Sequence, residues 1–232
     1  MVWADRALAG KLGPAERAAN AARVAGGSFD NNLLCIGEKQ VFAVSEIFDA
    51  LMEAMTRHNA YRLNAEQIDA LTKAAFTSGN DGKPHVNKDL VGKDPADLAA
   101  YAGVKLPNGI DLLFGETSLE HPFVQEEQMM PFVPFVRVSN VDRAIALAKE
   151  SEHGYGHTAV LHSRDTTAMS KMGKLMDCTI FVINGPSVAG LGAGGEGVPS
   201  FSIAGPTGEG VTTPLTFTRQ RRTAIVGGMR FI

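Results

Sequence analysis

Between residues 40 and 183, short apolar runs alternate with segments whose apolar residues recur at helical spacing. The runs predict buried strands, and the segments between them predict helices. A repeated strand, helix, strand order predicts an α/β fold, in which a mainly parallel sheet is covered by helices on both faces. Strands are expected at 40–44, 110–114, 132–138, 158–161 and 179–183, helices at 14–25, 45–55, 94–103, 141–149 and 165–175, a further helix from Asn64, and a loop at 77–91.

The composition supports a packed core of this kind. Of 232 residues, 44% are apolar and 20% are charged, and the net charge is -3. Without a basic excess, nothing in the charge favours binding to nucleic acid or to an anionic membrane. No apolar run reaches the roughly 18 residues of a membrane span, and Asp5, Arg6 and Lys11 interrupt the region where a signal peptide would be apolar. We therefore expect a cytoplasmic protein without nucleic-acid or membrane partners.

The last part of the chain has a different character. Residues 185–210 are crowded with glycine, and residues 211–217 and 223–226 are rich in β-branched and apolar residues. The latter two segments predict a hairpin or a long extended arm, whose backbone groups stay unpaired unless they add to another sheet. A second copy of the chain is the expected cover, which predicts a homodimer or a higher homo-oligomer.

Two local patterns resemble known ligand sites. The segment Gly190 to Gly195 fits the GxGxxG pattern of dinucleotide-binding loops, but Gly197 and Pro199 follow where such a loop needs the start of a helix. A flexible or closely packed loop lining a site is the favoured interpretation, and a phosphate loop is the alternative. Gly154 and Gly156 lie between His153 and His157, and the glutamate of an HExxH motif is absent. We expect no metal site.

The two cysteines are too few for a disulfide framework, and neither belongs to a CxxC pair. Cys35 follows a glycine-terminated helix and precedes a strand, at a turn where backbone amides could stabilise a thiolate and an oxyanion. From this position alone, Cys35 is either a nucleophile or a small buried hydrophobic residue. Cys178 precedes another strand and is expected to be a buried structural thiol.

The surroundings of Cys35 follow a recognisable pattern. Phe29-Asp30-Asn31-Asn32 precedes the cysteine, and Glu38-Lys39 and a strand follow it. This segment resembles the nucleophile segment of the CoA-acylating aldehyde dehydrogenases, notably the acetaldehyde and propanal enzymes of ethanolamine and propanediol utilisation. The similarity covers about residues 15–232, because further motifs of the family follow in the same order: Glu127 to Pro131, Gly156-His157-Thr158, Asn184 to Ser187, the Gly190 to Gly197 loop, and Thr207 to Thr212.

The resemblance implies the catalytic half of an aldehyde dehydrogenase at 15–204, followed by a C-terminal oligomerisation arm at 205–232. The leader at 1–14 does not resemble the strand expected there, and the cofactor half of the family would precede the cysteine segment. We therefore expect an excised domain of a longer enzyme, a truncated gene product or a redesigned protein. The implied reaction converts a short-chain aldehyde to its acyl-CoA through a cysteine thioester, with hydride transfer to NAD and with coenzyme A as co-substrate.

The resemblance also implies residue roles. Cys35 matches the nucleophile. Glu127 matches the carboxylate that hydrogen-bonds the ribose of the nicotinamide cofactor, and an exposed carboxylate without a role is the alternative. His157 matches the histidine of the acylating branch, which accepts the proton of the CoA thiol, only positions the nicotinamide, or only packs against its neighbours.

Two functions remain open. The first is the catalytic domain of a CoA-acylating aldehyde dehydrogenase, in the cytoplasm or inside a bacterial microcompartment. The second is a non-catalytic assembly module that keeps the fold and the arm but lacks the NAD-binding half. Either way, the chain alone is predicted to bind NAD weakly, because Glu127 offers a single ribose contact. Arg219, Arg221 and Arg222 are expected to mark a solvated turn of the arm, with binding of the CoA phosphates as the alternative.

Overall fold

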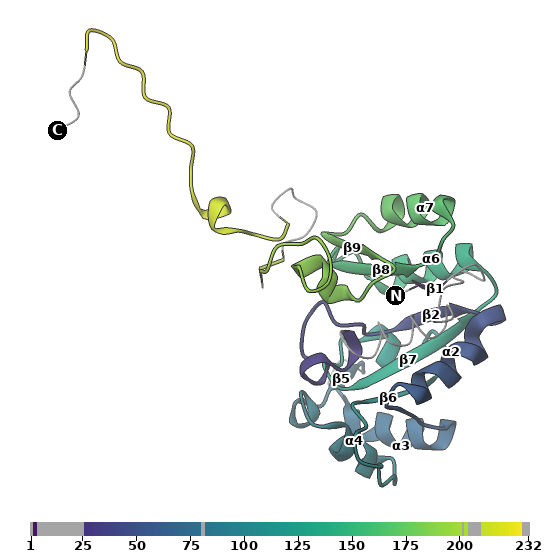
Figure 1. Ribbon diagram of the computed structural model, residues 1–232. Helices are drawn as coiled ribbons and strands as arrows, with labels where there is room; N and C mark the ends of the chain where they lie inside the picture. Colours follow the sequence, from purple (N-terminus) through teal and green to yellow (C-terminus); the bar gives the residue numbers. More distant parts are fainter. Residues whose placement is uncertain (1, 4–25, 80–81, 201, 204–209, 229–232) are drawn as a thin grey trace.

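The computed structural model describes residues 2–3, 26–79, 82–200, 202–203 and 210–228. In this part of the chain, seven parallel strands form one sheet in the order β3-β6-β7-β2-β1-β8-β9 (Figure 1). The strands are β1 (Val2–Trp3), β2 (Val41–Val44), β3 (Ala60–Arg62), β6 (Leu112–Glu116), β7 (Phe132–Val138), β8 (Thr158–His162) and β9 (Ile180–Ile183). The helices are α2 (Ser45–Arg57), α3 (Ala65–Ala75), α4 (Pro95–Tyr101), α5 (Pro122–Gln125), α6 (Val141–Ser151) and α7 (Thr166–Met176).

Both faces of the sheet are covered, as the predicted α/β fold requires. On one face, Val41 and Phe135 pack against the apolar side of α2. On the other face, Phe42 and Leu161 pack against α6 and α7, and Leu113 packs against α3 and α4. Because successive residues of a strand point to opposite faces, these wholly apolar strands can serve both layers at once.

Side chains at the helix starts explain where several helices begin. Asn64 Oδ1 accepts a hydrogen bond from Gln67 N at 2.9 Å, and Gln67 Oε1 accepts one from Asn64 N at 2.9 Å. This capping box confirms the predicted start of α3. Asn140 and Asp165 cap α6 and α7 through their side chains, and Pro95 occupies the first turn of α4.

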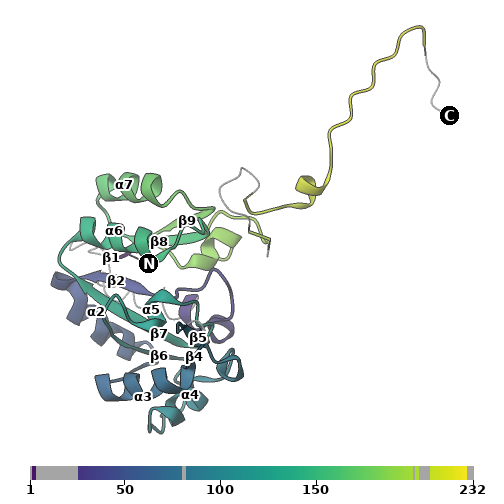
Figure 2. The same ribbon diagram turned by 180° about the vertical axis from the view of Figure 1, so that it is seen from behind.

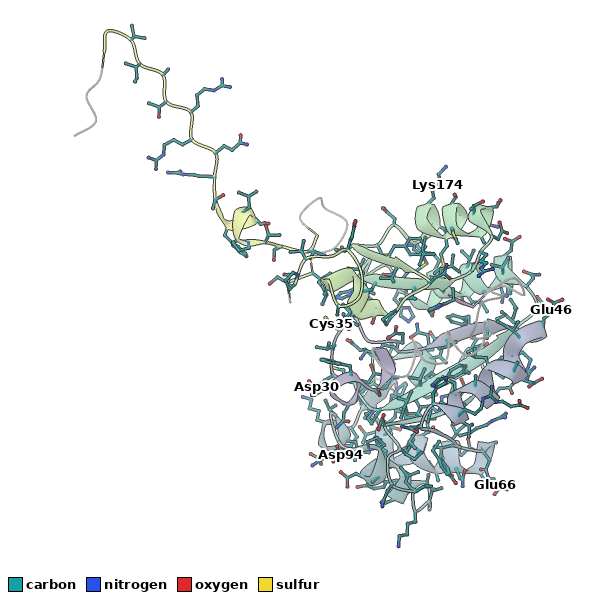
Figure 3. The ribbon with its side chains drawn as sticks, in the orientation of Figure 1. Asp30, Cys35, Glu46, Glu66, Asp94 and Lys174 are labelled. Carbon is teal, nitrogen blue, oxygen red and sulfur yellow. The ribbon has the colours of Figure 1, made fainter. Side chains whose placement is uncertain are left out.

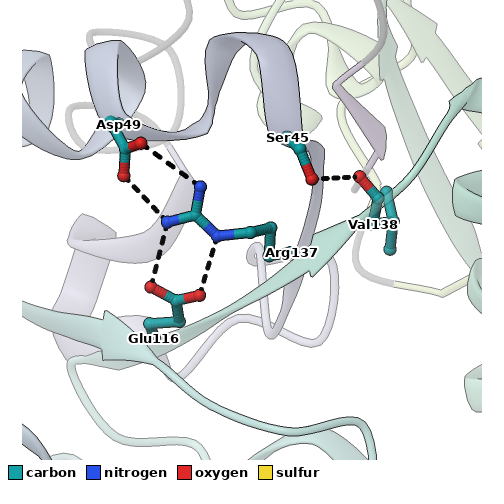
Figure 4. Close-up of polar contacts among 5 residues, drawn as sticks. All are labelled: Ser45, Asp49, Glu116, Arg137 and Val138. Carbon is teal, nitrogen blue, oxygen red and sulfur yellow. Dashed lines mark hydrogen bonds and ion pairs between the residues drawn. The ribbon is translucent and has the colours of Figure 1, made fainter.

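Polar contacts join the carboxyl end of β7 to α2 (Figure 4). The Arg137 guanidinium binds the carboxylates of Asp49 at 2.8 Å and Glu116 at 2.9 Å, and these bonds raise the pKa of Arg137. Ser45 Oγ donates a hydrogen bond to the backbone oxygen of Val138 at 3.0 Å. The contacts lie near the surface, so they orient α2 more than they stabilise the fold.

The segment at 77–91 is not a simple loop, which corrects the prediction. It takes part in two short antiparallel strands, β4 (Phe76–Ser78) and β5 (Pro84–Val86), and contains the turn η3 (Lys88–Leu90). Phe76 alone of the six strand residues is buried. Strands this short and this exposed leave almost no hydrophobic pattern, which is why the sequence does not reveal them.

The start of the chain contributes a central strand, which the sequence analysis did not predict. In β1, Val2 pairs with Phe42 of β2 and with Leu161 of β8, and Trp3 pairs with the next residue of each. Two residues cannot carry a periodic pattern, and only the neighbouring strands define this position. The helix expected at 14–25 lies outside the described residues.

The glycine-rich segment and the arm complete the described structure. The turn η4 (Ser187–Leu191) packs against β8 and β9. Beyond it, residues 210–228 contain one short turn, η5 (Pro214–Phe217), and no strand, so the hairpin alternative is wrong. An extended arm is confirmed: it projects away from the domain in both views (Figures 1 and 2), with Val226 98% exposed. No helix in the described part of the chain has the length and apolar character needed to span a bilayer.

Candidate active site

The three residues to which the resemblance gives roles all precede strands of the sheet. Cys35 lies before β2, Glu127 before β7, and His157 directly before β8. Because the strands are parallel and follow the order β7-β2-β1-β8, the residues ahead of them meet at one edge of the sheet. The site therefore lies at the amino-terminal edge, whereas open α/β sheets usually bind ligands beyond the carboxyl ends of their strands.

A cavity of about 470 Å³ lies at this edge, and Cys35, Glu127 and His157 all line it. Its volume falls in the range of small-molecule sites. Figure 3 labels Cys35 on the side of the domain from which the arm leaves. The structure thus brings together three residues that are far apart in the sequence. The remaining lining consists of Ile36 to Gln40, Val124 to Glu126, Ser151 to His153, Tyr155, Thr158, Val160 and Ile203.

Cys35 is exposed, which contradicts its interpretation as a small buried hydrophobic residue. It lies within a turn in which Gly37 N donates a hydrogen bond to Leu34 O at 2.9 Å. Ile36, the next residue, is buried and anchors the turn to the core beside Val160. An exposed thiol on an anchored turn is accessible to a substrate in the cavity.

His157 is half-buried in the wall of the cavity. Its Nδ1 lies 2.7 Å from Thr158 Oγ1, and this contact fixes the orientation of the ring. Burial lowers the pKa of His157, while the carboxylates of Glu127 and Glu152 act in the opposite direction. The imidazole is therefore neutral near pH 7 and can accept a proton.

Glu38 and Lys39 belong to the site although the sequence patterns assign no role to them. Glu38 is buried, and its carboxylate accepts hydrogen bonds from Ser187 N at 3.0 Å and Ser187 Oγ at 3.1 Å. Lys39 Nζ donates to the backbone oxygen of Asn32 at 2.5 Å and to Asn32 Oδ1 at 3.0 Å. The available signal was a charged pair directly ahead of an apolar strand, where the chain enters the core.

Burial of this pair predicts a minimum in the pH dependence of stability. Burial raises the pKa of Glu38 from 4.5 to about 7, so the folded state holds this proton more tightly and the free energy of unfolding falls over that interval, by roughly 3 kcal/mol. Burial lowers the pKa of Lys39 from 10.5 to about 8, so the free energy rises again above pH 8. We expect urea denaturation to be easiest near pH 7 to 8.

The Glu38→Gln variant serves as the control for this curve, because it removes the titrating group and leaves Lys39 in place. In this variant the free energy of unfolding is expected to stay constant between pH 4.5 and pH 7, and it is still expected to rise above pH 8. An unchanged acidic side would contradict the burial of the Glu38 carboxyl group.

Cys178 lies outside the cavity lining. It is half-buried, its Sγ donates a hydrogen bond to Ile180 O at 3.1 Å, and burial raises the pKa of its thiol. These properties suit a structural cysteine.

Iodoacetamide is therefore expected to alkylate Cys35 first in the native protein, because Cys35 is exposed and Cys178 is half-buried and hydrogen-bonded. Peptide mass mapping after short exposure measures the two sites, and labelling in urea gives the control in which both react. Preferential labelling of Cys178 in the native state would contradict the assignment of the nucleophile.

The other two sequence patterns do not form ligand sites in the described structure. Gly190 lies within η4, and residues 192–200 form no helix, so the loop lacks the helix start that a phosphate loop needs. His153 Nε2 lies 3.1 Å from Gln125 O. Among the described residues, no group of three or more histidine, cysteine or acidic side chains is arranged to hold a metal ion.

Comparison with known proteins gives relatives that share nearly the whole chain. No family model matches it. The acetaldehyde dehydrogenase (acetylating) of Escherichia coli K12 is 46% identical over 210 residues, which cover 90% of this chain and 45% of that protein. The chain thus spans about half the length of this curated relative.

Solved structures of similar enzymes match this chain over a similar share of its length. The propionaldehyde dehydrogenase of Rhodopseudomonas palustris with bound propionyl-CoA has a TM-score of 0.85 and 44% identity over 95% of this chain and 46% of its own. Another structure of that enzyme contains CoA and an acylated cysteine. An engineered glycolyl-CoA reductase with bound NADP+ has a TM-score of 0.85 and 43% identity over 95% of this chain and 48% of its own. Over nearly its whole length, the chain is therefore similar to about half of each of these CoA-acylating enzymes.

Proposed function

We propose that this chain carries the acyl-transfer site of a CoA-acylating aldehyde dehydrogenase, whose whole form takes a short-chain aldehyde, coenzyme A and NAD. The observation that supports this best is the convergence of Cys35, Glu127 and His157 on one cavity. The names of the relatives, with acetaldehyde in one and bound propionyl-CoA in another, support a small acyl group.

Cys35 acts as the nucleophile in this proposal. Its thiolate attacks the carbonyl carbon of the aldehyde and forms a carbon–sulfur bond. The carbonyl electrons move to the oxygen during this addition, and they re-form the carbonyl when a hydride leaves the same carbon, which produces a thioester on Cys35. A bound NAD would supply the acceptor for that hydride. The CoA sulfur then attacks the thioester carbon while neutral His157 accepts the proton of the CoA thiol. The bond to Cys35 breaks, the sulfur leaves as a thiolate, and acyl-CoA is released.

Glu127 is the residue of this chain that would contact NAD. It is exposed and lines the cavity, and its carboxylate can accept hydrogen bonds from both ribose hydroxyls. The described residues around the cavity include no glycine-rich loop at a helix start to hold the pyrophosphate. We therefore expect NAD to bind this chain more weakly than micromolar, as measured by calorimetry.

The acyl-transfer step can be tested on this chain because its reverse needs no NAD. Incubation with propionyl-CoA is expected to move the propionyl group to Cys35 and to release free CoA. Intact mass and peptide mapping measure the product. Cys178→Ser is expected to react normally, and Cys35→Ser is expected not to react. If propionyl-CoA fails to acylate Cys35 while iodoacetamide still labels it, the proposed function is wrong.

A second function, assembly, is supported by the arm. Leu215 and Phe217 are 78% and 79% exposed, and Ile225 is 50% exposed, which is unusual for apolar side chains in a lone domain. Arg219, Arg221 and Arg222 are exposed on the same segment, consistent with a solvated stretch. In this proposal the arm adds to the sheet of a second copy, giving a homodimer or a higher homo-oligomer. Residence in a bacterial microcompartment stays a prediction.

Truncation after Gly205 tests the role of the arm. The truncated chain is expected to sediment as a monomer or to aggregate, because the sheet of the partner loses its added strand. The intact chain under the same conditions is expected to be at least dimeric. A truncated chain that keeps the oligomeric mass and the solubility of the intact chain would rule out association through the arm.

A further inference from the structure

The chain ahead of Cys35 adopts an unusual backbone conformation. Asp30, Asn31 and Asn32 have φ angles of 49°, 52° and 61°, in the left-handed region that side chains normally avoid. Such a turn persists only when its surroundings hold it in place. Asn31 Nδ2 donates to Gly92 O at 3.0 Å and to Asp94 Oδ1 at 2.9 Å, which ties the outer side of the turn to the loop before α4.

The inner side of the turn is held by Asn32 and Lys39. Asn32 is fully buried, and its Nδ2 donates a hydrogen bond to Glu38 O at 3.2 Å. Its two oxygens accept hydrogen bonds from Lys39 Nζ. Residues 32–39 therefore form a loop closed by side chains at its base, and Cys35 lies in the middle of that loop. Gly37 leaves room for this closure, because a Cβ atom there would overlap Asn32 Oδ1.

The base of the loop is further attached to the sheet. Gln128 is buried, and its Nε2 donates to Lys39 O at 3.1 Å and to Phe132 O at 3.0 Å. Gln128 directly follows Glu127. The backbone of Lys39 is thus fixed to the start of β7, while its ammonium group is fixed to Asn32.

The charge of Lys39 acts on the groups around the cavity. Lys39 lines the cavity and interacts electrostatically with Cys35, Glu127, Glu38 and His157. Even partial burial of an ammonium group is costly, and a neutral side chain could donate to the same Asn32 oxygens. A lysine at this position therefore suggests that the positive charge itself has a role. The thiol of Cys35 reacts as an anion, which a nearby cation stabilises.

We propose that Lys39 is a positioning residue for Cys35: its ammonium group closes the loop at Asn32 and places a positive charge that favours the reactive thiolate. The role would serve the proposed acyl transfer, on which its biological meaning rests. The proposal predicts how fast the thiol of Cys35 reacts, so it can be tested without acyl-CoA, aldehyde or NAD.

The test measures the rate of Cys35 alkylation by iodoacetamide from about pH 6 to about pH 10. Lys39→Met is expected to slow alkylation about tenfold near pH 7, because it removes both the closure of the loop at Asn32 and the positive charge at the cavity. Lys39→Arg keeps the charge and is expected to react at nearly the wild-type rate. Lys105→Met, which removes an exposed lysine outside the cavity lining, is the matched control and is expected to change nothing.

The wild-type chain offers a second measurement that does not depend on any variant folding. While Lys39 is charged, it should raise the alkylation rate of Cys35 by anionic iodoacetate relative to the rate with neutral iodoacetamide. Burial lowers the pKa of Lys39 to about 8. The ratio of the two alkylation rates is expected to fall as the pH rises through that value. A constant ratio, or equal pH profiles for Lys39→Met and wild type, would overturn the proposal. Acylation of Cys35 by propionyl-CoA would then still decide the proposed function separately.

Discussion

The Gly26→Ala variant is expected to lose about 3 kcal/mol of its free energy of unfolding. Gly26 is buried against Glu38, and a Cβ atom at Gly26 would overlap the Glu38 carboxylate. The carboxylate would have to leave its position, which breaks both of its hydrogen bonds to Ser187 in a buried site. The urea midpoint measures the loss, and the rate of Cys35 alkylation reports whether the loop moves with it.

Gly185→Ala is the matched control for this substitution. A Cβ atom at Gly185 meets its nearest neighbours, in Val182 and Ala189, at 3.5 Å and 3.7 Å, which is ordinary van der Waals contact. It is expected to change stability by less than about 0.5 kcal/mol. Glu38→Ala added to Gly26→Ala should recover part of the loss, because it removes the overlapping group. If the two substitutions are simply additive, the overlap is not the cause.

The His157→Gln variant is expected to slow acyl transfer from propionyl-CoA to Cys35 by about a hundredfold, the usual contribution of a side chain that transfers a proton. Glutamine keeps much of the volume of the ring but can neither donate nor accept a proton at neutral pH. The rate of mass increase on Cys35 measures the effect. Iodoacetamide labelling of Cys35 should stay near the wild-type rate, because alkylation does not use CoA.

The pH profile separates proton transfer from simple positioning by His157. In the measured direction His157 returns a proton to the departing CoA sulfur, so the contribution of the ring to the wild-type transfer rate should fall as rising pH removes that proton, and burial lowers the pKa at which this happens. His157→Gln should lack this fall. His85→Gln, on β5 and outside the cavity lining, is the control and should keep both the rate and the profile. A loss in His157→Gln that leaves the shape of the profile unchanged would assign only a positioning role.

The parts of the fold that the sequence predicts are those determined by local chemistry. The capping box of Asn64 and Gln67 marks the start of α3, and the apolar runs of β2, β7 and β8 mark strands buried on both faces. The strands β1 and β4 are different. Each has no more than three residues, and each forms because a neighbouring strand is available, which is information that no local window contains.

The candidate site divides in the same way. Cys35, Glu127 and His157 were recognisable because they lie in motifs shared with a family, and their roles stay predictions until the acylation experiments are done. Glu38 and Lys39 were not recognisable, because their importance comes from burial. In the sequence they are an ordinary charged pair. Packing against Gly26 buries Glu38 and raises the pKa of its carboxyl group, and hydrogen bonds to Asn32 fix the ammonium group of Lys39.

The position of β1 bears on what any preceding part of the chain can reach. Val2 enters the sheet between β2 and β8 from the edge at which Cys35 and His157 lie. Residues ahead of Val2 therefore approach the sheet from the side of the cavity, where they can add side chains to its wall.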